Sequence, residues 1–418
     1  MFKFLHAADI HLDSPLTGLS QHDEAPTETI RVATRSALTR LVDSAIDEGV
    51  DFVLIAGDLY DGDWKDFSTG ISFNNEMRRL DAQQIPVYLI YGNHDAESRV
   101  TKSLQLQDNV HVFPTQEPET VHHPSLPVSL HGQGFATQSV SENLAENYPQ
   151  PSGNRYNIGL LHTNLGDREG HGNYAPSSLS QLVAHGYDYW ALGHIHIREI
   201  HHENPHVVYP GNTQGRHVKE TGPKGCYLVT VDDDLKTCQC DFIALDTVRW
   251  ENARVDCSDL VSEHALLDAI RIQLNKSLAK SDGRLLAVRL TLTGHTGLHE
   301  LLHAEHSRLR AECQNIALDI DPELIWIEDV RVRTRTLINP EDLAKQDALT
   351  AFVLDALKAF DPNKLPSSVD TLVKKLPAEA SRALRTSLEP QNEQEREAMR
   401  GEISAIVLQA IATSNSTE

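Results

Sequence analysis

The sequence predicts an α/β fold with a polar site at one edge of a sheet, and two observations support this prediction. Through residues 1–246, short apolar runs alternate with stretches whose apolar residues recur at helical spacing. Five of the runs lead directly into loops with carboxylate, imidazole or amide side chains. These five runs are residues 4–5, 52–56, 87–91, 158–161 and 189–192. Because sites in open α/β sheets form at the carboxyl ends of strands, we expect the five loops to meet at one site.

The elements between these strands follow in order. A stripe of apolar residues three and four apart predicts a helix over residues 28–48. A second helix is expected over residues 66–80, and a third over residues 178–185, where Gly186 ends it. The stretch 114–151 is rich in Pro, Gln and Ser. It predicts two strands and an irregular connection.

The pattern changes near Asp246, and we expect a small α+β domain over residues 247–336. Its strands and helices alternate over residues 247–256, 262–280, 284–293, 297–316 and 324–335. The pair Asn339-Pro340 marks a boundary. Residues 340–418 show a helical pattern, with helices expected at 341–360, 368–376 and 392–411. The apolar face of the last helix either packs on its own domain or binds a partner helix.

The composition of the 418 residues limits the class of protein. An apolar fraction of 40% can fill ordinary cores. The N-terminal apolar stretch is too short for a signal peptide, and no run reaches the roughly 20 residues of a membrane helix. We therefore expect a cytoplasmic protein without a membrane partner. Five scattered cysteines argue against a disulfide framework or a structural zinc site. A net charge of −23 argues against unaided nucleic-acid binding without excluding a local groove.

The polar loops carry seven candidate metal ligands. They are Asp9, His11, Asp58, Asn93, His162, His194 and His196. Carboxylate, imidazole and amide groups without thiolates suit Mn, Fe or Zn in an open site. Residues two apart on an extended chain point the same way, which pairs Asp9 with His11 and His194 with His196. Two divalent cations about 3.5–4 Å apart support displacement at phosphorus without a protein nucleophile. The set therefore predicts a phosphoesterase with two metal ions.

We assign four ligands to each ion and let Asp58 bridge them. The first ion takes Asp9, His11, Asp58 and His196, and the second takes Asp58, Asn93, His162 and His194.

His94 directly follows a candidate ligand, and we expect its side chain to face the substrate instead of the metals. It would donate a hydrogen bond to a phosphate oxygen or a proton to the leaving oxygen. We expect Asp95 to hold the tautomer of His94. Arg216 and His217 lie in a glycine-rich loop that should reach the rim of the site. They either contact the substrate phosphate or only shape the turn.

The motifs together resemble those of the metallophosphoesterase superfamily. Ala8-Asp9-Ile10-His11-Leu12, Gly57-Asp58-Leu59, Gly92-Asn93-His94-Asp95, His162 and Gly193-His194-Ile195-His196 match in order. More closely, residues 6–15, 209–217 and 220–225 resemble the YhaO branch of bacterial SbcD-type DNA-repair exonucleases. The close resemblance covers about residues 1–230. It implies a sandwich of two mixed sheets with helices outside.

The resemblance also implies an activity, a metal and a partner. The activity is Mn-dependent exonuclease cleavage of DNA phosphodiesters in DNA repair, with some endonuclease action on single strands. Residues 247–336 correspond to a capping domain. Residues 340–418 correspond to a segment that binds an SMC-like coiled-coil ATPase of the SbcC/YhaN type. Such a partner would supply the basic surface that this acidic chain lacks.

Other functions remain open at this point. A phosphodiesterase for a small substrate, such as a cyclic nucleotide or a nucleotide-sugar, would use the same metal site but would not need the long C-terminal part. A scaffold subunit that only regulates an ATPase would not need the complete ligand set. The helices at 28–48 and 66–80 either pair two subunits in a homodimer or pack within a monomer.

Overall fold

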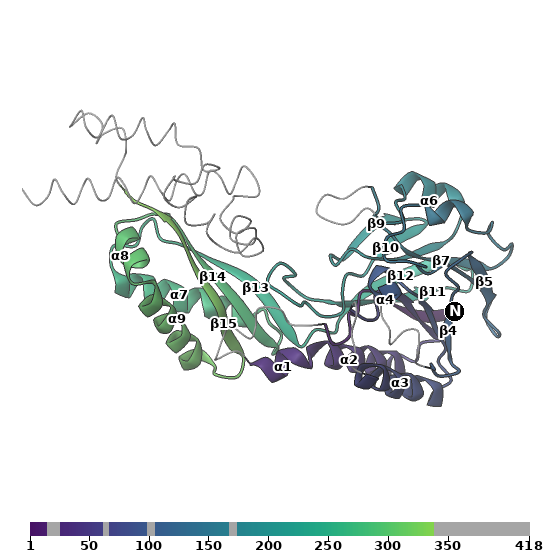
Figure 1. The fold of residues 1–418 in the computed structure, drawn as a ribbon, viewed down its shortest axis with the longest axis horizontal. Helices are drawn as coiled ribbons and strands as arrows, with labels where there is room; N and C mark the ends of the chain where they lie inside the picture. The colour runs from purple at the N-terminus through teal and green to yellow at the C-terminus, as the bar shows by residue number, and fades with distance from the viewer. Residues whose placement is uncertain (15–25, 62–66, 98–104, 167–173, 338–418) are drawn as a thin grey trace, which may run out of the picture. The chain divides into compact units, whose positions relative to one another are not determined.

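The computed structural model describes residues 1–14, 26–61, 67–97, 105–166 and 174–337 (Figure 1). It divides into two compact units. The first holds Met1–Asn252, Lys276–Arg289 and Asp321–Glu328, and the second holds Ala253–Asn275, Leu290–Ile320 and the described residues from Asp329 to 337, with gaps in both where residues are not described. The three helices expected beyond residue 340 lie outside the described residues. The domain limits set from the sequence stay predictions.

Two six-stranded sheets form the body of the first unit. The first sheet has the order β12-β11-β1-β2-β3-β4, in which β1 to β4 run parallel. Its strands are β1 (Phe2–Ala7), β2 (Phe52–Ala56), β3 (Val87–Ile90), β4 (Val110–Val112), β11 (Gly225–Val231) and β12 (Thr237–Ala244). The antiparallel strand β11 brings a distant part of the chain beside β1, with Thr230 opposite Lys3.

The second sheet has the order β5-β6-β7-β8-β10-β9, in which β6, β7, β8 and β10 run parallel. Its strands are β5 (Glu119–His122), β6 (Val128–Gly132), β7 (Tyr156–His162), β8 (Tyr189–Gly193), β9 (Glu199–Glu203) and β10 (His206–Tyr209). Strands β5 and β6 and the short helix η2 (Leu144–Asn147) fall within the stretch 114–151. They confirm the prediction of two strands with an irregular connection.

The two sheets pack face to face, and helices cover their outer faces. Phe4 and Phe52 stack between the sheets with ring centroids 5.0 Å apart, next to Tyr189. Their chain neighbours Leu5 and Val53 point the other way, into a core shared with α2 (Ala33–Asp47) and α3 (Phe67–Ala82). Helix α6 (Leu179–His185) covers the second sheet. The expected two-sheet sandwich flanked by helices is confirmed.

Two predicted helices are each divided in the structure. The helix expected at 28–48 consists of α1 (Thr27–Arg31) and α2, separated at Val32, whose φ of −91° and ψ of −1° depart from helical geometry. The helix expected at 297–316 consists of α8 (His299–Ala304) and α9 (His306–Ile320), with Glu305 at φ −114° and ψ 34° between them. Apolar spacing continues across both breaks, so periodicity did not reveal them.

A third sheet, of three strands, follows the first two along the chain. Its order is β13-β14-β15, with β13 (Val248–Asp256), β14 (Leu285–His295) and β15 (Ile325–Arg335). Helix α7 (Glu263–Leu278) lies between β13 and β14 in the sequence. This α+β pattern is the one expected over residues 247–336. Within the described ranges, every helix is too short or too polar to cross a bilayer.

The five strands that precede the candidate ligands end together. In the first sheet, the register pairs Ala7 of β1 with Ile55 and Ala56 of β2 with Ile90. In the second, the last residue of β7 pairs with Gly193, the last residue of β8. Parallel pairing therefore brings the loops after β1, β2 and β3 to one edge, and those after β7 and β8 to another. The site lies where these two edges meet.

Candidate metal centre

The loops that follow β1, β2 and β8 hold polar residues in the left-handed backbone region. The φ angle is 50° at Asp9, 46° at His11, 50° at Asp58 and 100° at His194. Such angles are uncommon for residues other than glycine, and they cluster at functional sites where surrounding contacts hold them. Backbone bonds do so here. The N–H groups of Asp9 and His11 donate to the carbonyls of Gly57 and Asp58, each at 3.0 Å.

Two of these loops start with a glycine because the space of a Cβ atom is already occupied. A Cβ on Gly57 would lie 2.3 Å from Nδ1 of His162. A Cβ on Gly193 would lie 1.8 Å from the carbonyl oxygen of Ala56. Glycine at position 57 therefore lets the backbone approach a candidate ligand, and glycine at position 193 lets it approach the backbone of β2.

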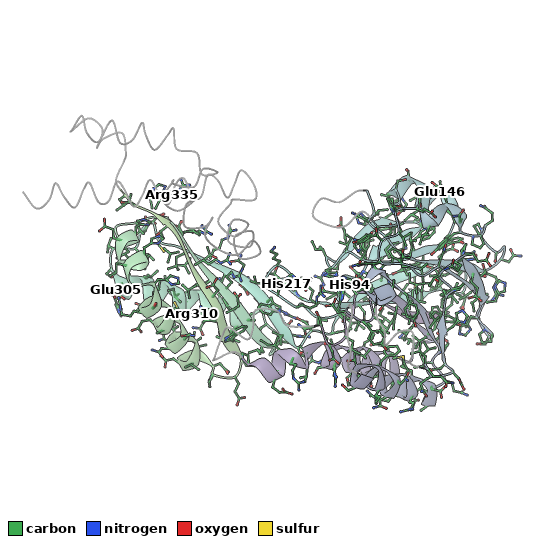
Figure 2. The ribbon with its side chains drawn as sticks, in the orientation of Figure 1. His94, Glu146, His217, Glu305, Arg310 and Arg335 are labelled. Atoms are coloured by element: carbon green, nitrogen blue, oxygen red, sulfur yellow. The ribbon has the colours of Figure 1, made fainter. Side chains whose placement is uncertain are left out.

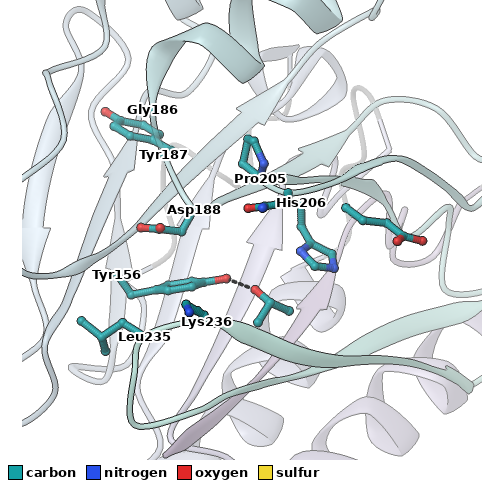
Figure 3. A pocket seen from close by; sticks show the side chains of 11 residues that line it. Tyr156, Gly186, Tyr187, Asp188, Pro205, His206, Leu235 and Lys236 are labelled. Atoms are coloured by element: carbon teal, nitrogen blue, oxygen red, sulfur yellow. Dashed lines mark hydrogen bonds between the residues drawn. The ribbon is translucent and has the colours of Figure 1, made fainter.

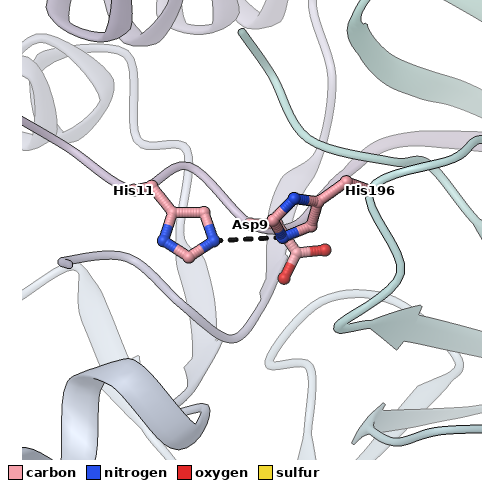
Figure 4. A group of neighbouring side chains, drawn as sticks. All are labelled: Asp9, His11 and His196. Atoms are coloured by element: carbon pink, nitrogen blue, oxygen red, sulfur yellow. Dashed lines mark hydrogen bonds between the residues drawn. The ribbon is translucent and has the colours of Figure 1, made fainter. Parts of the chain in front are cut away.

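Asp9, His11 and His196 each bring one ligand atom within 4.8 Å of the others (Figure 4). Nε2 of His11 lies 3.2 Å from Nε2 of His196. Burial, with a contribution from Arg216, lowers the pKa of His11 to about 3, so its ring is neutral. Nδ1 of His196 lies 2.7 Å from the carboxylate of Glu220, and with the proton on Nδ1 the lone pair of the ring is on Nε2. A cation between the two Nε2 atoms would complete this arrangement.

A second group, of Asp9, Asp58 and His162, is buried throughout. The Nδ1–H of His162 donates to the carbonyl of Ala56 at 3.0 Å. Its Nε2 therefore faces Asn93 Oδ1 at 3.0 Å and Asp58 Oδ2 at 3.4 Å. A carbonyl partner on the other nitrogen is the usual support of a ligating histidine. Burial opposes a charge on His162, but Asp58 and Asp9 raise its pKa to about 9. The two buried carboxylates therefore favour a positive charge at the position of the His162 ring.

Asp58 stands between the two halves of the centre. It also forms a third group, with His11 and His94. Its Oδ2 lies 3.8 Å from Nε2 of His11 and 3.4 Å from Nε2 of His162. Burial opposes its ionisation, yet His162 and then His11 hold the pKa of Asp58 far below its usual value. An ionised carboxylate thus lies where a bridging ligand is needed.

The remaining two candidate ligands lie at the border of these groups. Asn93 begins helix α4 (Asn93–Glu97) and contacts His162. His194 donates its backbone N–H to both carboxylate oxygens of Asp9 at 3.0 Å, and its ring centroid lies 5.2 Å from that of His162. The three groups do not include the ring of His194. Its role as a ligand stays a prediction.

The chain matches two known families and a curated relative. Residues 2–198 match the calcineurin-like phosphoesterases, and residues 250–335 match the middle domain of the metallophosphoesterase YhaO. An uncharacterized metallophosphoesterase YhaO from Bacillus subtilis (strain 168) is 37% identical over 295 residues, which are 70% of this chain and 71% of that protein. The chain belongs to the YhaO metallophosphoesterase family. At family level it is therefore a metal-binding hydrolase of phosphate esters.

More distant proteins are also similar to this family member. The DNA double-strand break repair protein Mre11 from Sulfurisphaera tokodaii is 24% identical over 254 residues, which are 57% of this chain and 62% of that protein. A crystal structure of a dimetal phosphatase from Danio rerio has 13% identity and a TM-score of 0.33, and covers 56% of this chain and 93% of that one. The family predicted from the motifs is confirmed by the YhaO relative.

The structure corrects the predicted partner of His94. Asp95 is fully buried, and its carboxylate accepts three backbone N–H groups at 2.8–3.1 Å, two from the loop after β2 and one from Gly92 in its own loop. Nδ1 of His94 lies instead 2.9 Å from Oδ1 of Asp61. The reason is that residues 93–95 begin a helix, where successive side chains point in different directions. Burial opposes a charge on His94, but its hydrogen bond to Asp61 raises its pKa.

Sequence reasoning missed two acids that contact site histidines. Asp61 contacts His94 and follows Asp58 by three residues, a spacing that places it at the same strand end. Glu220 contacts His196 from 24 residues away in the chain. Glu220 lies in a stretch that carries the family resemblance, but no local pattern pairs it with His196.

The two residues expected at the rim differ in exposure. The side chain of Arg216 is 17% exposed, and that of His217, labelled with His94 in Figure 2, is 54% exposed. Nη1 of Arg216 donates to Asp61 Oδ2 at 3.1 Å, and its Nη2 lies 3.4 Å from Glu220 Oε1. Arg216 thus lies against the centre. A contact of either residue with substrate stays a prediction.

A separate pocket of about 450 Å³ opens near the amino ends of β7, β8 and β10 (Figure 3). Its lining includes Tyr156, Asp188 and His206, and the hydroxyl groups of Tyr156 and Thr237 are hydrogen-bonded there. None of the seven candidate ligands lines it. Because the ligands follow the carboxyl ends of the strands, this pocket is not part of the metal centre.

Proposed function

We propose that the protein is a metal-dependent DNA exonuclease that hydrolyses phosphodiester bonds with two Mn²⁺ ions. The observation that carries this proposal is the set of three overlapping carboxylate and imidazole groups, two of which share Asp58. Support for DNA as the substrate comes from the likeness to Mre11. The proposal also covers endonuclease cleavage of single strands.

The chain offers ligands for two ions without any thiolate, a donor set that suits Mn²⁺. Asp9, His11, Asp58 and His196 would hold one ion, and Asp58, Asn93, His162 and His194 would hold the other. The facing Nε2 atoms of His11 and His196, 3.2 Å apart, fit a cation held between them. When bound, a pair of divalent cations supplies Lewis-acid chemistry at the phosphoryl group.

His94 is the candidate proton donor among the described residues. Its side chain is 35% exposed, so a substrate can reach it. Asp61 accepts from Nδ1, which leaves Nε2 to act on the substrate. In one role, Nε2–H donates to a non-bridging phosphate oxygen. In the other, it protonates the leaving oxygen as the phosphodiester bond breaks.

A partner would complete this activity. The chain has a net charge of −23, which repels the DNA backbone at long range. A coiled-coil ATPase of the SMC type, bound through residues 340–418, would supply a basic surface. In this proposal the complex works in the cytoplasm in DNA repair. Deletion of residues 340–418 should remove copurification of the ATPase, and retention of the ATPase by the truncated chain would contradict this part.

The direct test compares substrates. Purified protein with Mn²⁺ is incubated with end-labelled linear duplex DNA, cyclic nucleotides and a chromogenic phosphodiester. We expect progressive shortening of the DNA, and we expect Asp58→Asn to remove it. Asp43→Asn is the matched control, because Asp43 is an exposed carboxylate on α2. Turnover of cyclic nucleotides without DNA cleavage would replace this proposal with a small-molecule phosphodiesterase.

A further inference from the structure

Arg216 lies between two carboxylates that each contact a histidine of the centre. On one side, it donates to Asp61, whose other oxygen lies 2.9 Å from Nδ1 of His94. On the other side, it lies beside Glu220, whose Oε1 is 2.7 Å from Nδ1 of His196. These five side chains form a continuous chain of contacts, His94–Asp61–Arg216–Glu220–His196, which we call the acid–arginine bridge.

We propose that Arg216 and Glu220 are positioning residues, and that the acid–arginine bridge sets the ring of His196 and its distance from His94. The ring of His196 would then present its Nε2 to the first ion. The part that concerns His94 rests on the proposed function. The part that concerns His196 rests only on the metal site expected of the family.

The contacts determine which nitrogen of His196 carries the proton. Nδ1 lies 2.7 Å from Oε1 of Glu220 and 3.4 Å from Nη2 of Arg216. One nitrogen cannot donate to the carboxylate and accept from the guanidinium at once. The shorter bond to the charged acceptor is the stronger one, so Nδ1 carries the proton. The lone pair of Nε2 then faces His11.

Glu220 is itself held in place from several sides. Its side chain is 7% exposed. Oε2 accepts from Nδ2 of Asn212 at 2.9 Å and from the backbone N–H of Arg216 at 2.7 Å. From the same loop, Nζ of Lys224 donates to the carbonyl of His196 at 2.7 Å. The ring and the backbone of His196 are therefore both fixed by residues 212–224.

Direct binding of phosphate by Arg216 fits these contacts less well. Its one positive charge lies between two carboxylates, Asp61 and Glu220, so the three side chains together carry a net negative charge. Its Nε atom is buried and has no hydrogen-bond acceptor among the described residues. A guanidinium engaged in this way stiffens its surroundings but attracts a phosphodiester weakly.

The metal readout tests the role of Glu220 without any substrate. Mn²⁺ is titrated into the metal-free full-length protein by calorimetry. Glu220→Ala should weaken one of two Mn²⁺ sites by about 10–100-fold and leave the other unchanged. Glu220→Gln, which keeps one oxygen acceptor for Nδ1 of His196, should weaken that site less than Glu220→Ala. Lys219→Gln is the matched control, because Lys219 is an exposed cation of the same loop. Unchanged Mn²⁺ binding in Glu220→Ala would overturn the proposal.

A second measurement is made on the wild-type protein and therefore applies even if Glu220→Ala does not fold. ¹⁵N spectra of the histidines in metal-free wild-type protein report which ring nitrogen carries hydrogen, with His196 assigned by comparison with His196→Gln. We expect the Nδ1–H tautomer for His196. An Nε2–H tautomer would overturn the proposal.

Kinetics with the chromogenic diester separate positioning from phosphate binding by Arg216. Arg216→Gln should lower kcat by about 10–100-fold and change KM by less than about twofold, because misplaced groups slow the reaction step. Arg216→Lys should not restore kcat, since one ammonium group cannot bridge two carboxylates as a planar guanidinium does. A raised KM with unchanged kcat would overturn the proposal. If the wild type hydrolyses this diester but not DNA, the proposed function fails while this test still applies.

Discussion

His162 and His196 are both candidate ligands, but the chain holds them by different means. His162 is fully buried, and its Nδ1–H donates to a backbone carbonyl of β2. The side chain of His196 is 19% exposed, and its Nδ1 contacts a carboxylate that also faces Arg216. The fold itself therefore fixes the half of the centre around His162. Charged side chains of one loop fix the half around His196.

This difference determines which changes each half can tolerate. The carbonyl of Ala56, which accepts from His162, cannot be removed by a side-chain substitution. The half around His162 therefore depends on packing. A Cβ on Gly57 or Gly193 would disturb that packing. In the half around His196, removal of the charge of Glu220 should leave the packing unchanged. The ring of His196 would then lose the hydrogen-bond partner of its Nδ1. We therefore expect steric changes to affect the first half and charge changes to affect the second.

The largest effect should come from the residue that both halves share. Asp58→Asn should reduce bound Mn²⁺ from two per chain to none, and lower activity by about 10³-fold or more, because each cation contributes several kcal/mol. His196→Gln should reduce the number of bound Mn²⁺ ions only from two to one per chain. Elemental analysis after gel filtration measures both. Equal losses in the two variants would show that the halves are not separate.

The next effect concerns His94 and its partner. His94→Ala should lower kcat by about 10²–10³-fold, which is the loss expected for one hydrogen bond made in the transition state. Asp61→Asn should lower kcat by less, because Asn still accepts a hydrogen bond from Nδ1. Asp95→Asn should instead lower the free energy of unfolding, since both oxygens of Asp95 accept backbone N–H groups. A larger kinetic loss in Asp95→Asn without lost stability would restore Asp95 as the partner of His94.

A steric change tests the half held by the fold. In Gly193→Ala the new Cβ would meet the carbonyl of Ala56, and such overpacking costs about 1–3 kcal/mol of unfolding free energy. Gly153→Ala is the matched control, because a Cβ there has no neighbour within 4 Å. Urea unfolding of the metal-free proteins measures both. If Gly193→Ala is as stable as Gly153→Ala, the backbone of this half is less rigid than its contacts indicate.

A comparison of two buried histidines separates the effect of burial from that of nearby acids. His6 is as buried as His162, but it lies between the hydroxyl of Tyr189 and the carbonyl of Leu192, and no acid of the described residues shifts its pKa. Burial lowers the pKa of His6 to about 3. Below pH 6.5 the unfolded chain takes up a proton that folded His6 refuses, so stability should fall toward pH 3. The limit is about 1.4 kcal/mol per pH unit.

Chemical unfolding of the metal-free protein at several pH values measures this slope. His6→Gln should flatten it between pH 6.5 and pH 4, whereas the exposed control His264→Gln should leave it unchanged. An unchanged slope in His6→Gln would mean that other groups cause the loss of stability in acid.

Much of the fold could be predicted from the sequence because its strands are short, apolar and followed at once by polar loops. Parallel pairing alone then brought Asp9, Asp58 and Asn93 to one sheet edge. The helix breaks at Val32 and Glu305 were not predicted, because apolar spacing does not report the backbone angles of one residue.

The partners of the site residues were harder to predict than the ligands. Asp95 follows His94 in the sequence, yet the start of α4 turns it toward the backbone of the loop after β2 and away from His94. Glu220 reaches His196 from the loop that precedes β11, the strand that pairs with β1. Such contacts depend on the three-dimensional path of the chain, which local motifs do not contain.

The central claim is that two cations are gathered by side chains from both sheet edges. Anomalous diffraction from crystals soaked in Mn²⁺ tests it most directly. We predict two peaks that share Asp58, one beside His11 and His196 and one beside Asn93 and His162. A single peak, or peaks away from Asp58, would contradict the account.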